Sequence, residues 1–150
     1  MSENHKGFTL IELMCVVGII GILAAAGSLQ IFDLLQEARY RRAGLDLDSI
    51  YKDVLLYYAT NGEYPEDWQD MDYSSAPRDP WNNHYVYHNH DHITPGHRRK
   101  DGPTIPINSN YDIFSPGPDG EWKFDLTASQ SRDDVVVAND GQFIGQASDY

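Results

Sequence analysis

An uncharged apolar run of 20 residues, from Leu13 to Phe32, limits most strongly what this chain can fold into. A helix needs about 20 such residues to cross the hydrocarbon core of a bilayer. A single carboxylate, Glu12, lies directly before the run, and a carboxylate in apolar surroundings is costly unless it is paired. The sequence therefore predicts a membrane-spanning helix that stays with the chain, and a role for Glu12 that an anchor alone does not explain.

The rest of the chain is polar, which predicts an apolar N-terminal stalk followed by a polar head. A length of 150 residues favours one folded domain with one appended segment. The formal net charge of −12 disfavours nucleic acid and anionic lipid as partners of the head. The single cysteine, Cys15, lies inside the apolar run. No intrachain disulfide can therefore hold the head together.

The helix is expected to continue beyond the apolar run, from about Phe8 to Thr60. Apolar residues of its second half share the spacing of one helical face. They are Leu47, Ile50, Tyr51, Val54 and Tyr58. Asn61 and Gly62 then supply a C-terminal stop. This pattern predicts a transmembrane and assembly part over residues 8–35 and an amphipathic part over residues 36–62.

The head, residues 63–150, is expected to consist of short strands and turns. Its eight prolines exclude long helices. Alternating or apolar stretches predict strands over 84–88, 111–115 and 135–139, with 141–146 as a fourth candidate. The expected fold class is α+β, with a long N-terminal helix packed on a small antiparallel sheet.

The N-terminal residues carry a family resemblance. The run Lys6-Gly7-Phe8-Thr9-Leu10-Ile11-Glu12-Leu13-Met14 resembles the signal of type IV pilins and type II secretion pseudopilins. The resemblance implies that a leader, residues 1–7, is removed after Gly7 by a prepilin peptidase, and that Phe8 is then N-methylated. It also implies a pilin-like fold and assembly into a filament, in which Glu12 neutralises the new amino terminus of a neighbouring subunit.

The head carries a second part of the resemblance. Its landmarks are Glu63-Tyr64-Pro65, Asp79-Pro80-Trp81 and the run Tyr111 to Gly120. Together with the signal they resemble the major pseudopilin of type II secretion. This implies a single-pass inner-membrane protein with a periplasmic head, which joins minor pseudopilins on an inner-membrane assembly platform. The filament then drives folded proteins through the outer membrane.

Calcium is the cofactor that the resemblance implies, at a loop after the 111–115 strand. The matching residues are Asp119, Asp133 and Asp134, with the carbonyl of Pro116. Calcium prefers oxygen ligands on loops able to wrap it. Two departures from the family are a longer loop between Asp119 and Asp133 and valines in place of an Asn-Trp pair. Glu121 or Asp125 could therefore substitute as ligands.

The histidines support a competing hypothesis. Four of them would share one face of an extended strand, with a fifth nearby: His84, His88, His90, His92 and His97. Imidazoles suit zinc, nickel or copper. Nothing in their spacing fixes a four-ligand site, and solvated loop histidines are the simpler interpretation.

Three classes of function remain in order of support. The first is a structural filament subunit of type II secretion. The second is a type IV or competence pilin that acts in adhesion, motility or DNA uptake. The third is a histidine-based metal sensor or carrier anchored in the membrane. Catalysis has least support, because no nucleophile beside a base and no phosphate-binding loop is present.

Overall fold

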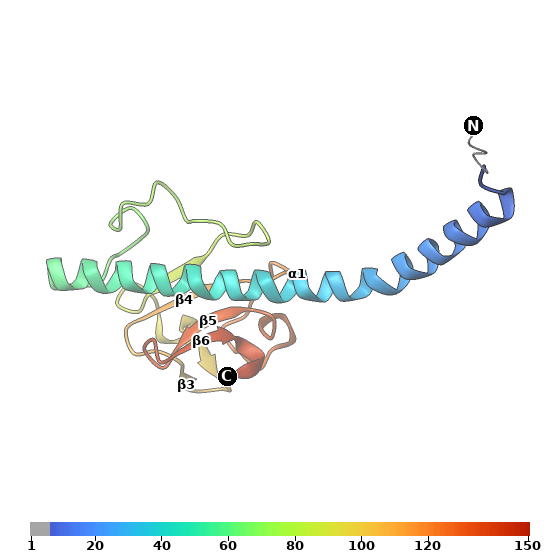
Figure 1. Cartoon of the computed structure of the whole chain (residues 1–150). Coiled ribbons are helices and arrows are strands. Elements are labelled where there is room, and N and C mark those ends of the chain that lie inside the picture. Colours follow the sequence, from blue (N-terminus) through green and yellow to red (C-terminus); the bar gives the residue numbers. More distant parts are fainter. Residues whose placement is uncertain (1–6) are drawn as a thin grey trace. The chain divides into compact units, whose positions relative to one another are not determined.

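The computed structural model describes residues 7–150 and, of residues 25–30, the backbone only. The helix α1 (Leu10–Asn61) has 52 residues and agrees with the predicted helix to within two residues at either end. The chain divides into two compact units, an N-terminal unit up to Glu37 and a head unit, Ala38–Tyr150. Figure 1 shows α1 and the strands of the head.

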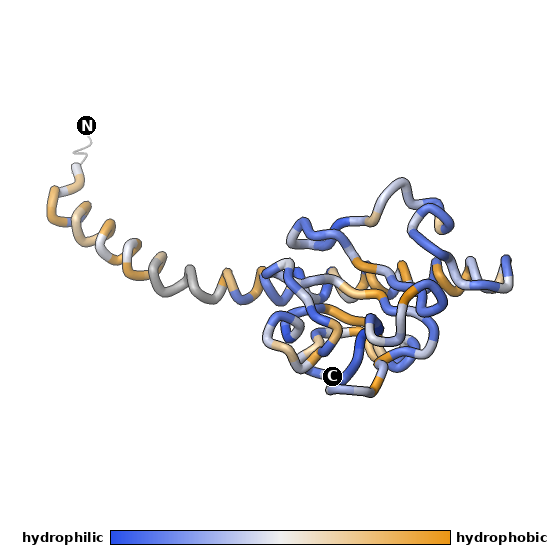
Figure 2. Tube along the Cα trace, turned by 180° about the vertical axis from the view of Figure 1, so that it is seen from behind, coloured by the Kyte–Doolittle hydropathy of each residue, from blue (hydrophilic) through white to orange (hydrophobic). Residues whose placement is uncertain are grey.

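The described part of the N-terminal unit is apolar and exposed. All side chains of residues 7–24 and 31–37 lie in contact with solvent in the isolated chain, and Figure 2 shows the hydrophobic residues that follow one another there. Among the residues that the structure describes, no helix carries an apolar stretch sufficient to span a membrane. The predicted span, Leu13 to Phe32, includes residues 25–30, whose side chains lie outside the described part, and leader residues 1–6 also lie outside it.

In the head unit, α1 buries one face. Ala43, Leu47, Ile50 and Val54 are buried and recur at helical spacing. The predicted face is therefore confirmed in its centre, while Tyr58 at its end is 43% exposed. The helix stops where Gly62 adopts a positive φ of 81°, and the Gly62 N–H donates to the Tyr58 carbonyl at 2.8 Å.

A four-stranded antiparallel sheet forms the other layer of the head. Its strands are β1 (Val86–Asn89), β4 (Tyr111–Ser115), β5 (Val135–Ala138) and β6 (Phe143–Gln146), in the order β1-β4-β5-β6. In the β1–β4 pair Tyr87 lies opposite Ile113, and in the β5–β6 pair Val136 lies opposite Gly145. The predicted α+β fold is confirmed, and all four predicted strands are present with small shifts of their ends.

Both faces of the central strands are buried, which explains why β4 and β5 do not alternate apolar with exposed polar residues. One face packs on α1 through Ile113, Val135 and Val137. The opposite face carries Phe114 and Val136. Loop residues cover this second face, namely Ile107, Trp122 and Leu126.

A short two-stranded ladder was not predicted. It pairs β2 (Lys100–Asp101) with β3 (Ile105–Pro106). Two residues per strand are too few to show a period in the sequence. The ladder begins next to Arg99, whose side chain is fully buried on the second face of the main sheet.

Candidate functional site

The start of α1 is closed by a reciprocal pair of side chains, Thr9 and Glu12. The Thr9 backbone N–H and hydroxyl donate to Glu12 Oε2 at 2.9 and 2.8 Å, and the Glu12 N–H donates to Thr9 Oγ1 at 3.3 Å. This is a capping box, in which two residues satisfy each other's free N–H groups at a helix start. The Glu12 carboxylate thus has a partner within its own chain.

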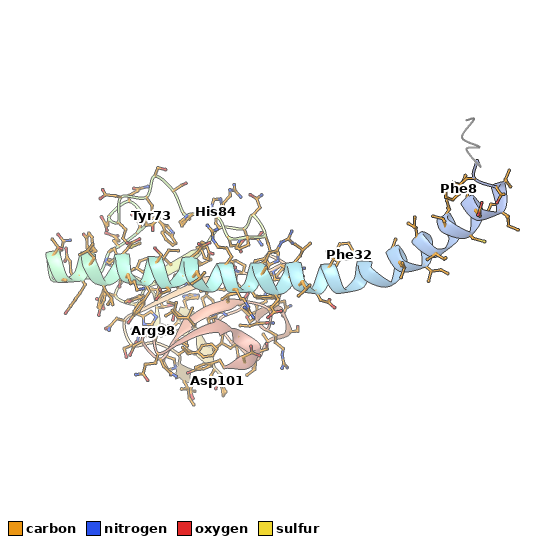
Figure 3. All side chains as sticks on the ribbon, viewed as in Figure 1. Phe8, Phe32, Tyr73, His84, Arg98 and Asp101 are labelled. Carbon is orange, nitrogen blue, oxygen red and sulfur yellow. The ribbon has the colours of Figure 1, made fainter. Side chains whose placement is uncertain are left out.

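The predicted cleavage point lies just before this cap. A Cβ atom placed on Gly7 would meet nothing within 4 Å. Phe8 is 82% exposed and lies at the start of the described chain (Figure 3). The peptide bond between Gly7 and Phe8 is therefore accessible, in a segment outside any helix or strand.

The acidic loop follows β4 and returns to β5. Gly117 has a φ of 68°, and a Cβ atom there would lie 2.3 Å from the Asp133 carbonyl oxygen. This close backbone approach is available only to glycine. The Asp119 N–H lies 3.4 Å from Asp133 Oδ2, within hydrogen-bond distance. Two of the predicted ligands, Asp119 and Asp133, are thereby brought together.

The carboxylates of Asp119 and Asp133 repel each other in this loop. Burial raises the pKa of the Asp133 carboxyl, and the neighbouring Asp119 charge raises this pKa further. Asp119 Oδ1 also accepts from the Glu121 N–H at 2.8 Å. Asp125 is engaged differently, because its Oδ1 accepts from the backbone N–H and the hydroxyl of Thr127.

Asp134 differs from the other predicted ligands because it is fully buried. Its Oδ2 accepts from Nη2 of Arg99 at 2.6 Å, and both side chains have no exposed surface. Its Oδ1 has no hydrogen-bond partner in the described structure. Burial raises the pKa of Asp134 to about 7, although the Arg99 guanidinium acts in the opposite direction.

The donor set suits calcium in kind, because every candidate ligand is an oxygen and one buried oxygen lacks a partner. Across residues 7–150, however, no three His, Cys, Asp or Glu side chains are already gathered as a metal site. The Pro116 carbonyl and other loop carbonyls would have to complete the shell.

The predicted shared face of histidines is wrong, because β1 ends at Asn89 and the chain turns there. Each imidazole has its own surroundings. His84 Nδ1 contacts the Ala76 carbonyl at 2.8 Å, and the His88 ring contacts the rings of Phe114 and Trp122.

The other three histidines are also held separately. His90 is buried against Asp112 at 2.9 Å. His92 lies 3.7 Å from Glu66, and His97 contacts Thr94. In the part of the chain that the structure describes, these five side chains do not converge on one ion.

The sequence is similar to known proteins both at its N-terminus and over most of its length. Residues 3–28 match the prokaryotic N-terminal methylation motif. Type II secretion system core protein G of Pseudomonas aeruginosa is 31% identical, over 79% of this chain and 87% of that protein. The chain belongs to the family of type II secretion system core protein G.

Other relatives differ in how much of this chain they match. Core protein G of Escherichia coli is 27% identical over 80% of this chain and 86% of its own length. A type IV major pilin of Neisseria gonorrhoeae is 38% identical, but over only 53% of this chain and 48% of the pilin. No solved structure matches this chain significantly. Similarity to core protein G thus extends through the head, whereas similarity to the pilin covers about half of the chain.

Two parts of the site escaped prediction from the sequence. The Thr9–Glu12 cap has a recognisable signal, a threonine three residues before a glutamate at a helix start. Arg99 had none, because the basic stretch from Arg98 to Lys100 reads as a solvated turn.

Proposed function

We propose that the processed chain is the structural subunit of a type II secretion pseudopilus, which polymerises through its N-terminal helix and drives folded proteins across the outer membrane. The observation that carries this proposal is the N-terminal unit, in which a capped helix exposes its described apolar side chains. Such a surface is costly in water and needs lipid or other helices around it. Membership of the core protein G family supplies the secretion context.

The finer parts of the proposal concern place and partners. We place the N-terminal helix in the inner membrane as a single pass, with the head in the periplasm. A prepilin peptidase removes the leader, and minor pseudopilins and an inner-membrane platform take part in assembly. The net charge of −12 argues against nucleic acid as a partner. The role is structural and not enzymatic, in keeping with relatives named as pilins and secretion core proteins.

Processing is tested by replacing Gly7 with Val in the full chain. A side chain at this position meets nothing within 4 Å, so the fold should be unaffected. We expect the variant to keep its leader in mass spectra of membrane fractions. Gly18→Ala, at a second uncrowded glycine, should be processed normally. A correctly cleaved Gly7→Val chain would remove the signal assignment.

Assembly is tested at the capping box, because the structure gives Glu12 a local role that competes with the proposed one between subunits. Glu12→Gln removes the charge but leaves an acceptor for the cap. Thr9→Ala weakens the cap but leaves the charge. If Glu12 pairs with a neighbouring amino terminus, Glu12→Gln should abolish filaments while Thr9→Ala permits them. The reverse pattern would assign Glu12 to capping alone.

The secretion role is tested by deleting the gene. We expect exported proteins to accumulate inside the outer membrane and the full-length gene to restore export. Intact secretion with loss of DNA uptake or twitching would favour the alternative, a type IV or competence pilin. The half-length match to a type IV pilin is the observation that keeps this alternative in view.

Calcium is the cofactor we propose for the head, held by Asp119, Asp133, Asp134 and the Pro116 carbonyl. The unpartnered Asp134 Oδ1 and the repulsion between Asp119 and Asp133 support it. A bound ion would supply positive charge that offsets this repulsion. Chelation should lower the melting temperature of the detergent-solubilised chain, and calcium should restore it better than magnesium.

The matched variants for the calcium test are Asp119→Asn and Asp67→Asn. Asp67 is an exposed aspartate whose Oδ1 caps a turn at Gln69, far along the chain from the acidic loop. Loss of the calcium response in Asp119→Asn, but not in Asp67→Asn, is the expected result. A wild-type chain indifferent to both ions would remove the calcium proposal.

A further inference from the structure

A buried cation lies on the second face of the sheet, beside the acidic loop. The side chain of Arg99 has no exposed surface, and its guanidinium lies 4.1 Å from the centre of the Phe114 ring. The Arg99 backbone N–H donates to Asp112 Oδ2 at 2.7 Å, which fixes the base of the side chain. The guanidinium is thus held in one place by packing and points to Asp134.

The hydrogen bonding of this buried pair is incomplete. In the described structure, Nε and Nη1 of Arg99 and Oδ1 of Asp134 have no partner. A buried ion pair with unsatisfied groups is a poor source of stability, and well-packed apolar residues could often replace it without loss. Stability alone therefore gives little reason for an arginine at this position.

The surroundings of Asp134 offer another reason. Asp134 follows Asp133 directly in the chain, and Asp133 Oδ2 lies within hydrogen-bond distance of the Asp119 N–H. Of the three predicted carboxylate ligands, Asp134 pairs with Arg99, whereas Asp119 and Asp133 contact one another through the Asp119 N–H.

We propose that Arg99 is the resident counter-ion of the acidic loop, which holds Asp134 in place and offsets its charge before any metal ion binds. This inference rests on the proposed calcium site and adds a residue outside the ligand set. Arg99 is a positioning residue, because it acts through Asp134. With Arg99 present the loop folds in the ion-free protein. The ion then has to neutralise only Asp119 and Asp133, so its contribution to stability is reduced.

The first test needs no calcium and uses the full chain in detergent with a chelator. Arg99→Met keeps an unbranched side chain over Phe114 but leaves Asp134 buried and unpaired. We expect its melting temperature to fall by roughly 10 °C, as for other broken buried pairs. Asp134→Asn added to Arg99→Met should recover much of this loss, since neither member of the pair is then charged. Additive losses in the double variant would overturn the counter-ion role.

The second test adds calcium. In Arg99→Met both oxygens of Asp134 are free and a neighbouring positive charge is gone, so calcium should bind at least about tenfold more tightly. The rise in melting temperature with calcium should be larger than in the wild-type chain. Arg99→Lys, which keeps the charge, should bind calcium like the wild type. Equal calcium affinity in Arg99→Met and wild type would contradict the inference.

Arg98→Met is the matched control. Arg98 is the neighbouring residue and also loses one positive charge, but its Nη2 donates to the His90 carbonyl at 3.4 Å and not to Asp134. Its calcium affinity should stay at the wild-type value, and a tenfold gain there would show a general charge effect and overturn the proposal. If no variant binds calcium, the proposed calcium site fails, while the chelator experiment still decides whether Arg99 is the counter-ion of Asp134.

Discussion

The two units of this chain use the same kind of side chain in opposite ways. Leu23 in the N-terminal unit is 66% exposed, whereas Leu47 in the head unit is fully buried, although both lie in α1. Leu47 packs on the sheet face that carries Ile113 and Val137. Among the described residues of its own unit, Leu23 has no such core. The apolar residues of the head are explained by the chain itself, and those of the N-terminal unit only by surroundings outside the chain.

Two carboxylates, one in each unit, differ in the same way. Glu12 in the N-terminal unit is exposed and is held by its near neighbour Thr9. Asp112 in the head is buried and accepts from His90, from Asn108 and from the Arg99 backbone. A local cap suffices for a solvent-facing carboxylate, whereas a buried one requires several partners from distant positions. The head is therefore specified by long-range contacts and the N-terminal unit by local ones.

The strongest test of this contrast is a pair of identical substitutions, Leu47→Ala and Leu23→Ala. The buried leucine should cost about 2–5 kcal/mol in the free energy of unfolding of the solubilised chain. The exposed one should stay within about 0.5 kcal/mol. Denaturant titration followed by tryptophan fluorescence measures both, because Trp68, Trp81 and Trp122 all lie in the head.

Filament yield should reverse that order. Leu23→Ala removes apolar surface that is exposed in the isolated chain, so it should reduce assembly more than stability. Equal unfolding losses for the two variants would show that the N-terminal unit has a core of its own, and the contrast between the units would fail.

Two glycine substitutions compare a crowded backbone position in the head with an uncrowded one in the N-terminal unit. Gly117→Ala places a methyl group 2.3 Å from the Asp133 carbonyl oxygen at a φ of 68°, and should cost more than about 2 kcal/mol. Gly18→Ala meets nothing within 4 Å, and within a helix it should raise local helix stability by roughly 1 kcal/mol. Unfolding by denaturant reports the first and far-UV circular dichroism the second. A tolerated Gly117→Ala would mean that the acidic loop is not held against β5.

A buried polar contact within the head should give a smaller effect. Asp79 accepts from the N–H groups of Trp81 and Asn83 and from the Ser115 hydroxyl at 2.6 Å. Ser115→Ala removes this last bond and also the bond that Ser115 Oγ accepts from the Gly117 N–H at 3.0 Å, and should cost about 1–2 kcal/mol in the free energy of unfolding. Ser129→Ala, at a hydroxyl that contacts only the adjacent Gln130, should have no measurable effect. A loss shared by both variants would point to a general effect of removing hydroxyls.

The sequence predicted those parts of the molecule that repeat a pattern. The apolar spacing around Leu47 indicated the buried helix face, and the runs at 111–115 and 135–138 indicated the central strands. Contacts between distant positions left no such pattern. The burial of Arg99 depends on Phe114 and Asp134, which lie 15 and 35 residues further along the chain. Local periodicity cannot show contacts of this kind, and the same limit hid the end of β1 before His90.

Tyrosine titration gives the smallest expected effect and reports on the head alone, since all ten tyrosines lie at Tyr40 or beyond. Burial, with a hydrogen bond to Asp53 of 2.6 Å, raises the pKa of Tyr73 to about 12. A tyrosine whose pKa is raised on folding stabilises the folded chain below pH ~10, its unfolded value, and loses this contribution as the pH rises toward 12.

Tyr73→Phe should therefore cost somewhat less than about 1 kcal/mol in the free energy of unfolding at pH 8. Its difference from wild type should shrink between pH 10 and 12, measured by denaturant titration at each pH. Tyr58→Phe, whose ring stacks on Tyr64 at 4.4 Å, keeps the bond between Tyr73 and Asp53 and is the matched control. If the difference in unfolding free energy between Tyr73→Phe and wild type stays constant with pH, the bond to Asp53 does not hold Tyr73 to α1. Long-range polar contacts would then contribute less to the stability of the head than the contrast between the two units implies.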